Sequence, residues 1–218
     1  MQQQRKPTIT PQEYLEIERQ AATKSEYFDG KTFAMAGASR THNLILTNTI
    51  VSLGTSLKRR GCDTYANDMR VEVNPTGLYT YPDVVVVCGP PQFKDTNEDT
   101  LLNPTVIMEV LSDSTASYDR GEKFEHYSTL PSLIDYLLIA QDRAAIEQRV
   151  RTDRGWQLAF HYGLDAVVPL PAIGCELRLS DVYDRIEFTN PQAARGSFRV
   201  VKEPHEEYHV ERPGGPTY

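Results

Sequence analysis

The chain has 218 residues, of which 39% are hydrophobic, and 30 acidic residues outnumber 23 Lys and Arg to give a formal net charge of −7. This length suits one well-packed domain of ordinary globular composition. The acidic balance argues against a broad electropositive surface for nonspecific nucleic-acid binding, although carboxylates gathered in an active site would contribute to the same total.

Neither a membrane span nor a targeting signal is predicted. No apolar run approaches the length needed to cross a bilayer, and the opening segment MQQQRKPTIT lacks the charged and apolar regions of a signal peptide. We therefore expect no membrane partner and a cytoplasmic location. Cys62, Cys88 and Cys175 are odd in number, far apart and without metal-type spacing, so we expect reduced thiols with no disulfide and no zinc site.

The first half of the chain predicts helices followed by strands. A short helix begins at Thr10, where a Thr cap precedes a Pro in the first turn. Two short strands meet at Asp29-Gly30, a pair that supplies the positive φ angles of a tight hairpin. A long helix, apolar on one side, leads to Gly61. The strands expected after it span residues 63–66, 69–73, 80–88 and 105–111.

The second half predicts one more long helix and a run of strands. The helix covers residues 117–130 and stops before Pro131. Further strands are expected at 132–140, 144–152 and 156–162, and a late helical turn at 179–186. Because the runs at 80–88 and 105–111 are almost continuously apolar, they suit central strands covered on both faces. The order of elements predicts an α/β or α+β domain, with a mixed β-sheet flanked by helices.

Each of these two apolar strands carries one acid, Asp83 in the first and Glu109 in the second. A lone carboxylate in an apolar strand is costly unless it is paired, hydrogen-bonded or bound to a metal. If the strands are neighbours, the two acids meet at the edge of the sheet and offer oxygen ligands to a hard cation. The plainer alternatives are exposure to solvent, a helix cap or pairing with an arginine.

Lys123, on the helix that follows, completes a set suited to phosphodiester cleavage. In such a set the acids hold a metal that activates water, and the ammonium stabilises the charge that develops on phosphate. Taken alone, Lys123 is better interpreted as a solvated helix lysine paired with Asp119 four residues earlier.

Three segments together resemble the Uma-two family of proteins with a restriction-endonuclease-like fold. They are YPDVVVV, PTVIMEVLSDSTASYDRGEKFEHY and LPSLIDYLLIAQDR. The resemblance runs from about Pro11 to Phe188 and is most specific between Glu109 and Tyr136. It implies a restriction-endonuclease-like domain over residues 11–188. We expect a flexible segment at 1–10, outside the resemblance, and a poorly ordered tail at 189–218, which is rich in Pro, Gly and charge.

The resemblance also implies membership of the PD-(D/E)xK nuclease superfamily, with Pro82-Asp83 as the PD and Glu109 as the second acid. Leu111 stands where the superfamily lysine is expected. In the Uma-two pattern the lysine lies on the following helix, a place that Lys123 occupies.

Two further residues match family positions, and a third lies near Lys123 on its helix. Glu26 matches an acid near the amino terminus that could complete a metal site, or it is an exposed strand glutamate. His42 matches a family histidine that would contact phosphate or the acids, or it caps or packs the long helix. Tyr127, one turn after Lys123, would position the lysine or cover the core.

The leading hypothesis is a metal-dependent DNA endonuclease. Asp83 and Glu109, helped by Glu26 and the Val110 carbonyl, would bind Mg²⁺ or Mn²⁺, and Lys123 would orient the attacking water or neutralise the transition state. The alternatives are a noncatalytic nucleic-acid-binding or protein-interaction module on the same fold, and hydrolysis of another phosphate ester. A twofold axis that matches duplex DNA favours a homodimer.

Overall fold

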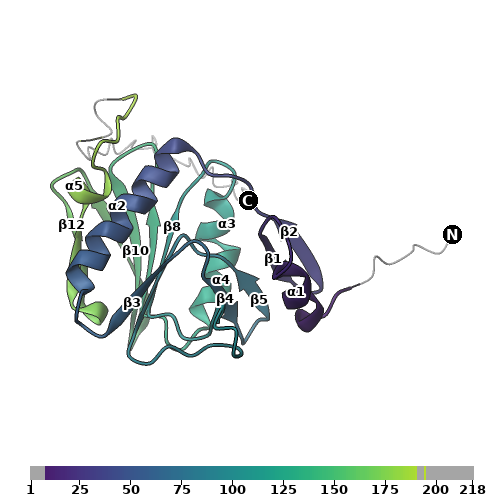
Figure 1. The fold of residues 1–218 in the computed structure, drawn as a ribbon. Helices are drawn as coiled ribbons and strands as arrows, with labels where there is room; N and C mark the ends of the chain where they lie inside the picture. Colours follow the sequence, from purple (N-terminus) through teal and green to yellow (C-terminus); the bar gives the residue numbers. More distant parts are fainter. Residues whose placement is uncertain (1–7, 191–193, 195–218) are drawn as a thin grey trace, which may run out of the picture.

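The computed structural model describes residues 8–190 and residue 194, which form an α+β fold of three sheets flanked by helices (Figure 1). The helices are α1 (Pro11–Glu18), α2 (Arg40–Leu57), α3 (Ala116–Arg120), α4 (Glu122–Ser128) and α5 (Leu179–Val182), with a 3₁₀ turn η1 at Pro171–Ile173. The strands are β1 (Ser25–Phe28), β2 (Lys31–Ala34), β3 (Cys62–Ala66), β4 (Arg70–Val73), β5 (Leu78–Thr80), β6 (Val84–Cys88), β7 (Thr100–Leu101), β8 (Val106–Val110), β9 (Asp135–Ile139), β10 (Ala145–Thr152), β11 (Gly155–Tyr162), β12 (Val167–Leu170) and β13 (Cys175–Arg178). Most of the two segments for which disorder was predicted lies outside the described residues.

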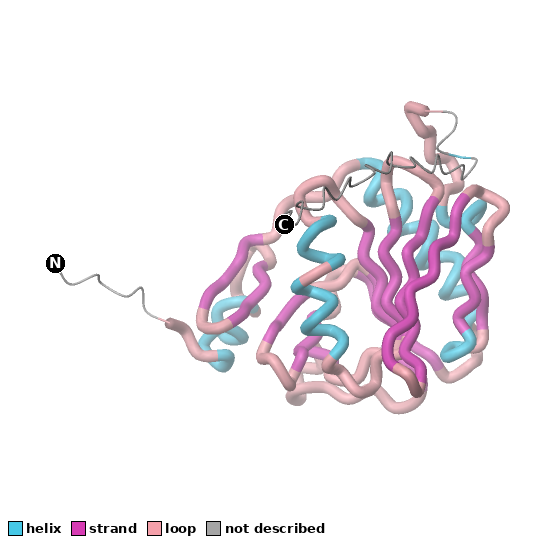
Figure 2. The backbone as a smooth tube through the Cα atoms, turned by 180° about the vertical axis from the view of Figure 1, so that it is seen from behind, coloured by secondary structure: helices cyan, strands magenta, loops and turns pink. Residues whose placement is uncertain are grey.

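The largest sheet has six strands in the order β11-β10-β9-β8-β6-β3, with β8 and β9 parallel and the other pairs antiparallel. On one face, α2, α5 and the small sheet β12-β13 pack against Val84 and Val86. On the other, α4 and strands of the second sheet pack against Val85 and Val87 (Figure 2). Strands β6 and β8 are thus covered on both sides, which confirms their prediction as central strands.

In the second sheet, of order β2-β1-β5-β4-β7, strands β4 and β5 pack against the main sheet, whereas β1 and β2 form a lobe with α1 beside the main body (Figure 1). Helix α1 begins as predicted, because Thr10 and Glu13 form a reciprocal capping box. The β1–β2 hairpin also turns where expected, with φ values of 47° at Asp29 and 74° at Gly30. Ile9 joins this lobe, since its backbone N–H donates to the Gly30 carbonyl.

Two predicted elements are each divided into two. The expected strand at 80–88 is interrupted, because Thr80 ends β5 in the second sheet and Val84 begins β6 in the main sheet. Pro82 lies in the crossing, where its missing donor costs no ladder hydrogen bond. The expected helix at 117–130 is broken at Gly121, whose φ and ψ of −107° and −100° are not helical. The chain therefore changes course just before Lys123.

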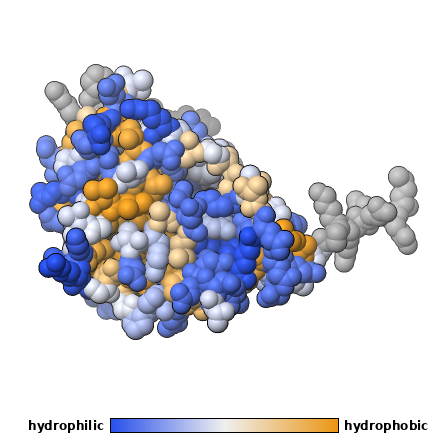
Figure 3. Space-filling view, viewed as in Figure 1, coloured by the Kyte–Doolittle hydropathy of each residue, from blue (hydrophilic) through white to orange (hydrophobic). Residues whose placement is uncertain are grey.

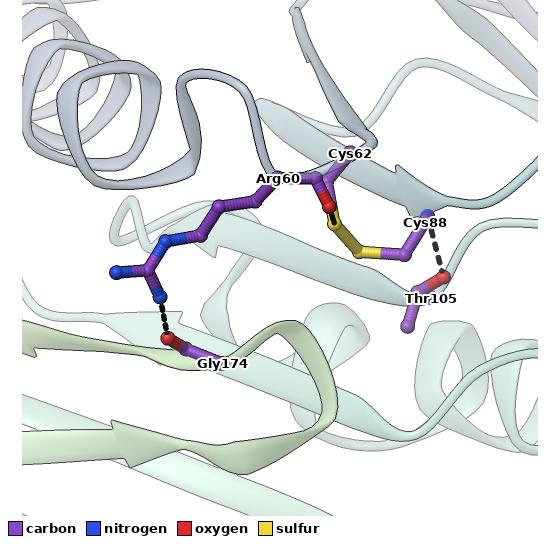
Figure 4. The surroundings of a disulfide bond; sticks show 5 residues. All are labelled: Arg60, Cys62, Cys88, Thr105 and Gly174. Atoms are coloured by element: carbon purple, nitrogen blue, oxygen red, sulfur yellow. Dashed lines mark hydrogen bonds between the residues drawn. A yellow bond between two sulfur atoms is a disulfide. The ribbon is translucent and has the colours of Figure 1, made fainter.

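The prediction of reduced cysteines is wrong for two of the three. Cys62 and Cys88 form a disulfide (Figure 4), and Cys175 is free. Although the two cysteines are far apart in sequence, they are opposite each other in the antiparallel pair of β3 and β6. Sequence spacing alone gave no sign of that register.

On the face shown in Figure 3, hydrophilic side chains surround smaller hydrophobic areas. Exposed hydrophobic residues include Val51 on α2, and Ile17 and Phe33 on the lobe. No helix within the described residues is long and apolar enough to cross a membrane.

Candidate active site

The two strand acids meet where β6 begins and β8 approaches its end. The antiparallel register pairs Val84 with Met108, so the next pair outward is Asp83 with Glu109. The backbone N–H of Asp83 donates to Glu109 Oε2 at 3.4 Å. Glu109 is 5% exposed. The structure therefore brings together the two acids that the sequence placed on neighbouring strands.

The Asp83 carboxylate is held from two sides. Its Oδ2 accepts a hydrogen bond of 2.7 Å from the Val110 backbone N–H, and its Oδ1 lies 2.9 Å from His42 Nε2. His42 projects from the first turn of α2, which Ser39 caps by accepting from the His42 N–H. Of the two roles open to His42, the structure shows contact with the acids.

Lys123, on α4, places its ammonium group among three carboxylates. Its Nζ lies 2.9 Å from Glu109 Oε1, 3.1 Å from Glu26 Oε1 and 3.7 Å from Asp119 Oδ1. The Lys123 side chain is only 7% exposed. The alternative of a solvated lysine is therefore wrong, although the pairing with Asp119 is present.

Glu26 reaches this cluster from the lobe. Strands β1 and β5 pair at Tyr27 and Tyr79, so Glu26 lies beside Thr80, and the Thr80 hydroxyl donates to Glu26 Oε1. Only two residues separate Thr80 from Asp83 in the chain. The crossing between the two sheets therefore brings Glu26, the neighbour of Thr80, close to the strand acids. Glu26 is thus a partly buried ion-pair partner and not an exposed strand glutamate.

Tyr127 lies one turn after Lys123 and is fully buried. Its hydroxyl donates to Glu109 Oε1 at 2.9 Å. Its ring belongs to the core between α4 and the main sheet, on the face that also carries Val85 and Val87. Burial, reinforced by the neighbouring Glu109, raises the pKa of Tyr127 well above its ordinary value. Tyr127 therefore stays a neutral donor that holds the acid in place.

The site carries more negative than positive charge. Burial raises the pKa of Glu109 to about 8, against the attraction of Lys123, and burial also raises the pKa of Asp119. Burial alone would lower the pKa of Lys123, but Glu109, Glu26 and Asp119 together raise it well above its ordinary value. Lys123 is thus a permanent ammonium group. Its single positive charge does not fully balance the negative charge of the carboxylates around it.

These features fit a hard divalent cation held by few protein ligands. Across the described residues, no group of three or more Asp, Glu, His or Cys side chains is arranged to hold a metal by itself. Asp83 and Glu109 do supply neighbouring carboxylate oxygens, and Mg²⁺ commonly binds one or two carboxylates together with water and substrate phosphate. A cation bound there would stabilise the ionised form of Glu109 and would lower the pKa that burial raises.

Two contacts of the site were not predicted as functional. Asp119 is 3% exposed and faces Lys123 across the break at Gly121. Its position four residues before Lys123 was the available signal, but that spacing is common on solvated helices. Thr80 gave no sequence signal, because its role depends on the pairing of β1 with β5.

The comparison with protein families agrees with this geometry. A family model described as "Uma2: Putative restriction endonuclease" matches residues 11–180, which span α1 to the start of α5. The chain belongs to the Uma2 family. The resemblance drawn from the sequence is thereby confirmed, and the segments that carried it include Asp83, Glu109 and Lys123.

Similar proteins extend over most of the Uma2 chain. The uncharacterized protein slr1290 of Synechocystis sp. (strain ATCC 27184 / PCC 6803 / Kazusa) is 35% identical over 182 residues, covering 84% of this chain and 95% of that protein. The uncharacterized protein sll1609 of the same organism is 37% identical over 161 residues, covering 73% and 91%. The crystal structure of "a putative nuclease belonging to DUF820" from Anabaena variabilis ATCC 29413 matches with a TM-score of 0.67 at 19% identity, covering 80% of this chain and 97% of that one. At that identity the likeness establishes the shared fold, which is nuclease-like as predicted.

Proposed function

We propose that this Uma2 protein is a metal-dependent endonuclease that hydrolyses phosphodiester bonds in DNA. The observation that carries the proposal is the buried cluster in which Lys123 lies within 3.1 Å of both Glu109 and Glu26, with Asp83 against Glu109. Acids in excess of a fixed ammonium group suit a site that binds a cation and a phosphate together. Membership of a family described as restriction endonucleases supports the same reaction class.

In this proposal Asp83 and Glu109 hold Mg²⁺ or Mn²⁺, and Glu26, which contacts Lys123 in the structure, is a third ligand if it turns from the lysine. When bound, the metal supplies an activated water and stabilises charge on the phosphate. Lys123 cannot act as a general base, because its raised pKa keeps it protonated. It donates to the attacking water or to a phosphate oxygen instead. His42 and the Val110 N–H keep the Asp83 carboxylate in position.

The direct test is cleavage of supercoiled plasmid, linear duplex and single-stranded DNA with Mg²⁺, Mn²⁺ or EDTA. We expect metal-dependent cleavage that Asp83→Asn and Lys123→Met each reduce by at least about a hundredfold. Asp63→Asn, which changes an exposed acid on β3, is the matched control and should retain activity. If none of the DNA forms is cut with either metal, the nuclease proposal fails. Metal-independent DNA binding unaffected by Asp83→Asn would then favour the noncatalytic module.

We further propose that the protein is a homodimer, with β11 as its interface. β11 is the edge strand of the main sheet, and its sequence GWQLAFHY has no Lys, Asp, Glu or Pro of the kind that protects edge strands from pairing. Leu158 and Phe160 on this strand are 52% and 48% exposed. Among described residues, β11 pairs only with β10.

The β11 sequence is self-complementary in an antiparallel pairing centred on Ala159. That register places Leu158 opposite Phe160, and Trp156 opposite Tyr162, of the second copy. Cross-strand pairs of aromatic and aliphatic side chains stabilise a sheet. Light scattering should give the mass of a dimer for the wild type and of a monomer for Phe160→Lys. A monomeric wild type at micromolar concentration would contradict the proposal.

A cytoplasmic location remains part of the proposal. Disulfides are rare in the cytoplasm, so the redox state of Cys62 and Cys88 in cells tests this location. Thiol labelling in unbroken cells should modify both cysteines if the protein is kept in a reducing compartment.

A further inference from the structure

An exposed aromatic ring lies beside the candidate active site. Phe33 belongs to β2, the outermost strand of the second sheet, and all four residues of that strand are exposed. Phe33 itself is 51% exposed, on a strand where a Phe would ordinarily be covered. The lobe that carries it shows hydrophobic surface among hydrophilic side chains (Figure 3).

The register of the hairpin decides which way Phe33 faces. Phe33 is paired with Glu26, and Lys31 is paired with Phe28. Residues opposite each other in an antiparallel pair project from the same face, with Cβ atoms about 4.5 to 5.5 Å apart. Phe33 and Lys31 therefore share the face from which Glu26 reaches Lys123.

The other face of the hairpin is already occupied. Tyr27, between Glu26 and Phe28, projects toward α1, where its ring stacks on that of Tyr14 with centroids 5.0 Å apart. On the site-facing side, Phe28 packs against His126 of α4, with ring centroids 4.6 Å apart. Strand β1 is thus covered on both faces, whereas all four residues of β2 are exposed and Phe33 lies open beside its strand partner Glu26.

We propose that Phe33 is a stacking platform for an unpaired base of the DNA strand whose phosphate lies at Asp83, Glu109 and Lys123. This inference rests on the proposed nuclease function and names its substrate class, DNA that is single-stranded or locally opened at the scissile position. The face of a base is available to an aromatic ring only where the base is not enclosed in a duplex stack. Lys31, exposed on the same face, contacts a backbone phosphate.

Because the site is negatively charged, an uncharged stacking contact with Phe33 is important for DNA binding. The carboxylates that surround Lys123 repel a polyanion before a metal compensates them. A stacking contact is uncharged, so it contributes to binding without being opposed by those acids. Substrates with an open base would therefore be bound better than uninterrupted duplex of the same sequence.

The test compares the full-length wild type with Phe33→Ala, Phe33→Trp and Ile17→Ala. Ile17 is 56% exposed on α1, on the opposite side of the same lobe, so it controls for loss of an exposed apolar side chain. The probes are a fluorescein-labelled oligothymidylate and a matched duplex, with binding measured by anisotropy in EDTA. Phe33→Ala should weaken binding of the single strand by at least about fivefold. Phe33→Trp should restore it, and duplex binding should change by less than about twofold.

Cleavage rates of the same two DNAs with Mn²⁺ separate this inference from the nuclease proposal. If the wild type binds the single strand through Phe33 but cuts neither DNA, the nuclease proposal fails and the stacking contact stands. If the wild type cuts DNA and Phe33→Ala binds and cuts both forms like Ile17→Ala, the stacking inference is overturned. Failure of the wild type to bind the oligothymidylate at all overturns it too.

Discussion

Replacing Lys123 with Met would leave Glu109, Glu26 and Asp119 facing one another without their shared ammonium partner. The Lys123 side chain is 7% exposed and that of Glu109 is 6% exposed, so water screens this loss only weakly. Removing one member of a buried ion pair costs about 3 to 5 kcal/mol. Because Glu109 can take up a proton, we expect the lower end, about 3 kcal/mol near pH 8, which lowers Tm by about 6 to 12 °C in a chain of this size.

The cost should depend on pH with a defined sign. The pKa of Lys123 is raised by folding, so its contribution is fully present below its unfolded pKa and is lost only as pH rises through the higher folded value. The Lys123→Met penalty is therefore present at neutral pH. It should be larger above about pH 8 and smaller at and below that pH, because Glu109 without its ammonium partner takes up a proton at a higher pH than the value of about 8 that it has beside Lys123.

Urea unfolding followed by the fluorescence of Trp156 measures these differences. Lys58→Met, which changes an exposed lysine at the end of α2, is the matched control and should cost less than about 0.5 kcal/mol. Lys123→Met/Glu109→Gln should be about 1 to 2 kcal/mol more stable than Lys123→Met, because one uncompensated acid is gone. A Lys123→Met variant as stable as the wild type at pH 8 would refute this account of the cluster.

Three further predictions follow from contacts around the site and in the core. His42→Ala should weaken Mn²⁺ binding about 10- to 100-fold in calorimetry, because His42 orients Asp83, and unchanged affinity would contradict that role. Burial raises the pKa of Asp135 above its ordinary 3.8, so the wild type loses stability as pH rises above that value. Asp135→Asn should therefore gain stability relative to wild type between acidic and neutral pH, and a constant difference in urea midpoint would show that Asp135 does not titrate in this way. Reduction of Cys62–Cys88, which closes a loop of 26 residues, should lower the free energy of unfolding by about 3 kcal/mol, whereas a Cys62→Ser/Cys88→Ser variant should not respond to dithiothreitol.

Local signals in the sequence predicted much of the fold. The helix cap at Thr10, the hairpin at Asp29-Gly30 and the central strands β6 and β8 were predicted, because each depends on residues close together in the chain. The short strands β7, β12 and β13 were missed, since strands of two to four residues carry too little periodicity to be recognised.

Pairing between distant segments could not be predicted in the same way. The Cys62–Cys88 bond and the Thr80–Glu26 contact both follow from strand register, which no local pattern specifies. Asp83 and Glu109 were exceptions, because a charge in an apolar strand is visible without a partner. For Lys123, the family resemblance predicted a place in the same site as those acids, whereas the residues around it in the sequence indicated an ordinary helix surface.

The most direct measurement is calorimetric titration of Mn²⁺ into the wild-type protein and into the Asp83→Ala/Glu109→Ala variant. If the acids at the start of β6 and the end of β8 hold the metal, the wild type binds Mn²⁺ with measurable heat and the variant does not. No binding by the folded wild type, or equal binding by both proteins, would contradict the claim that these buried acids form a metal centre.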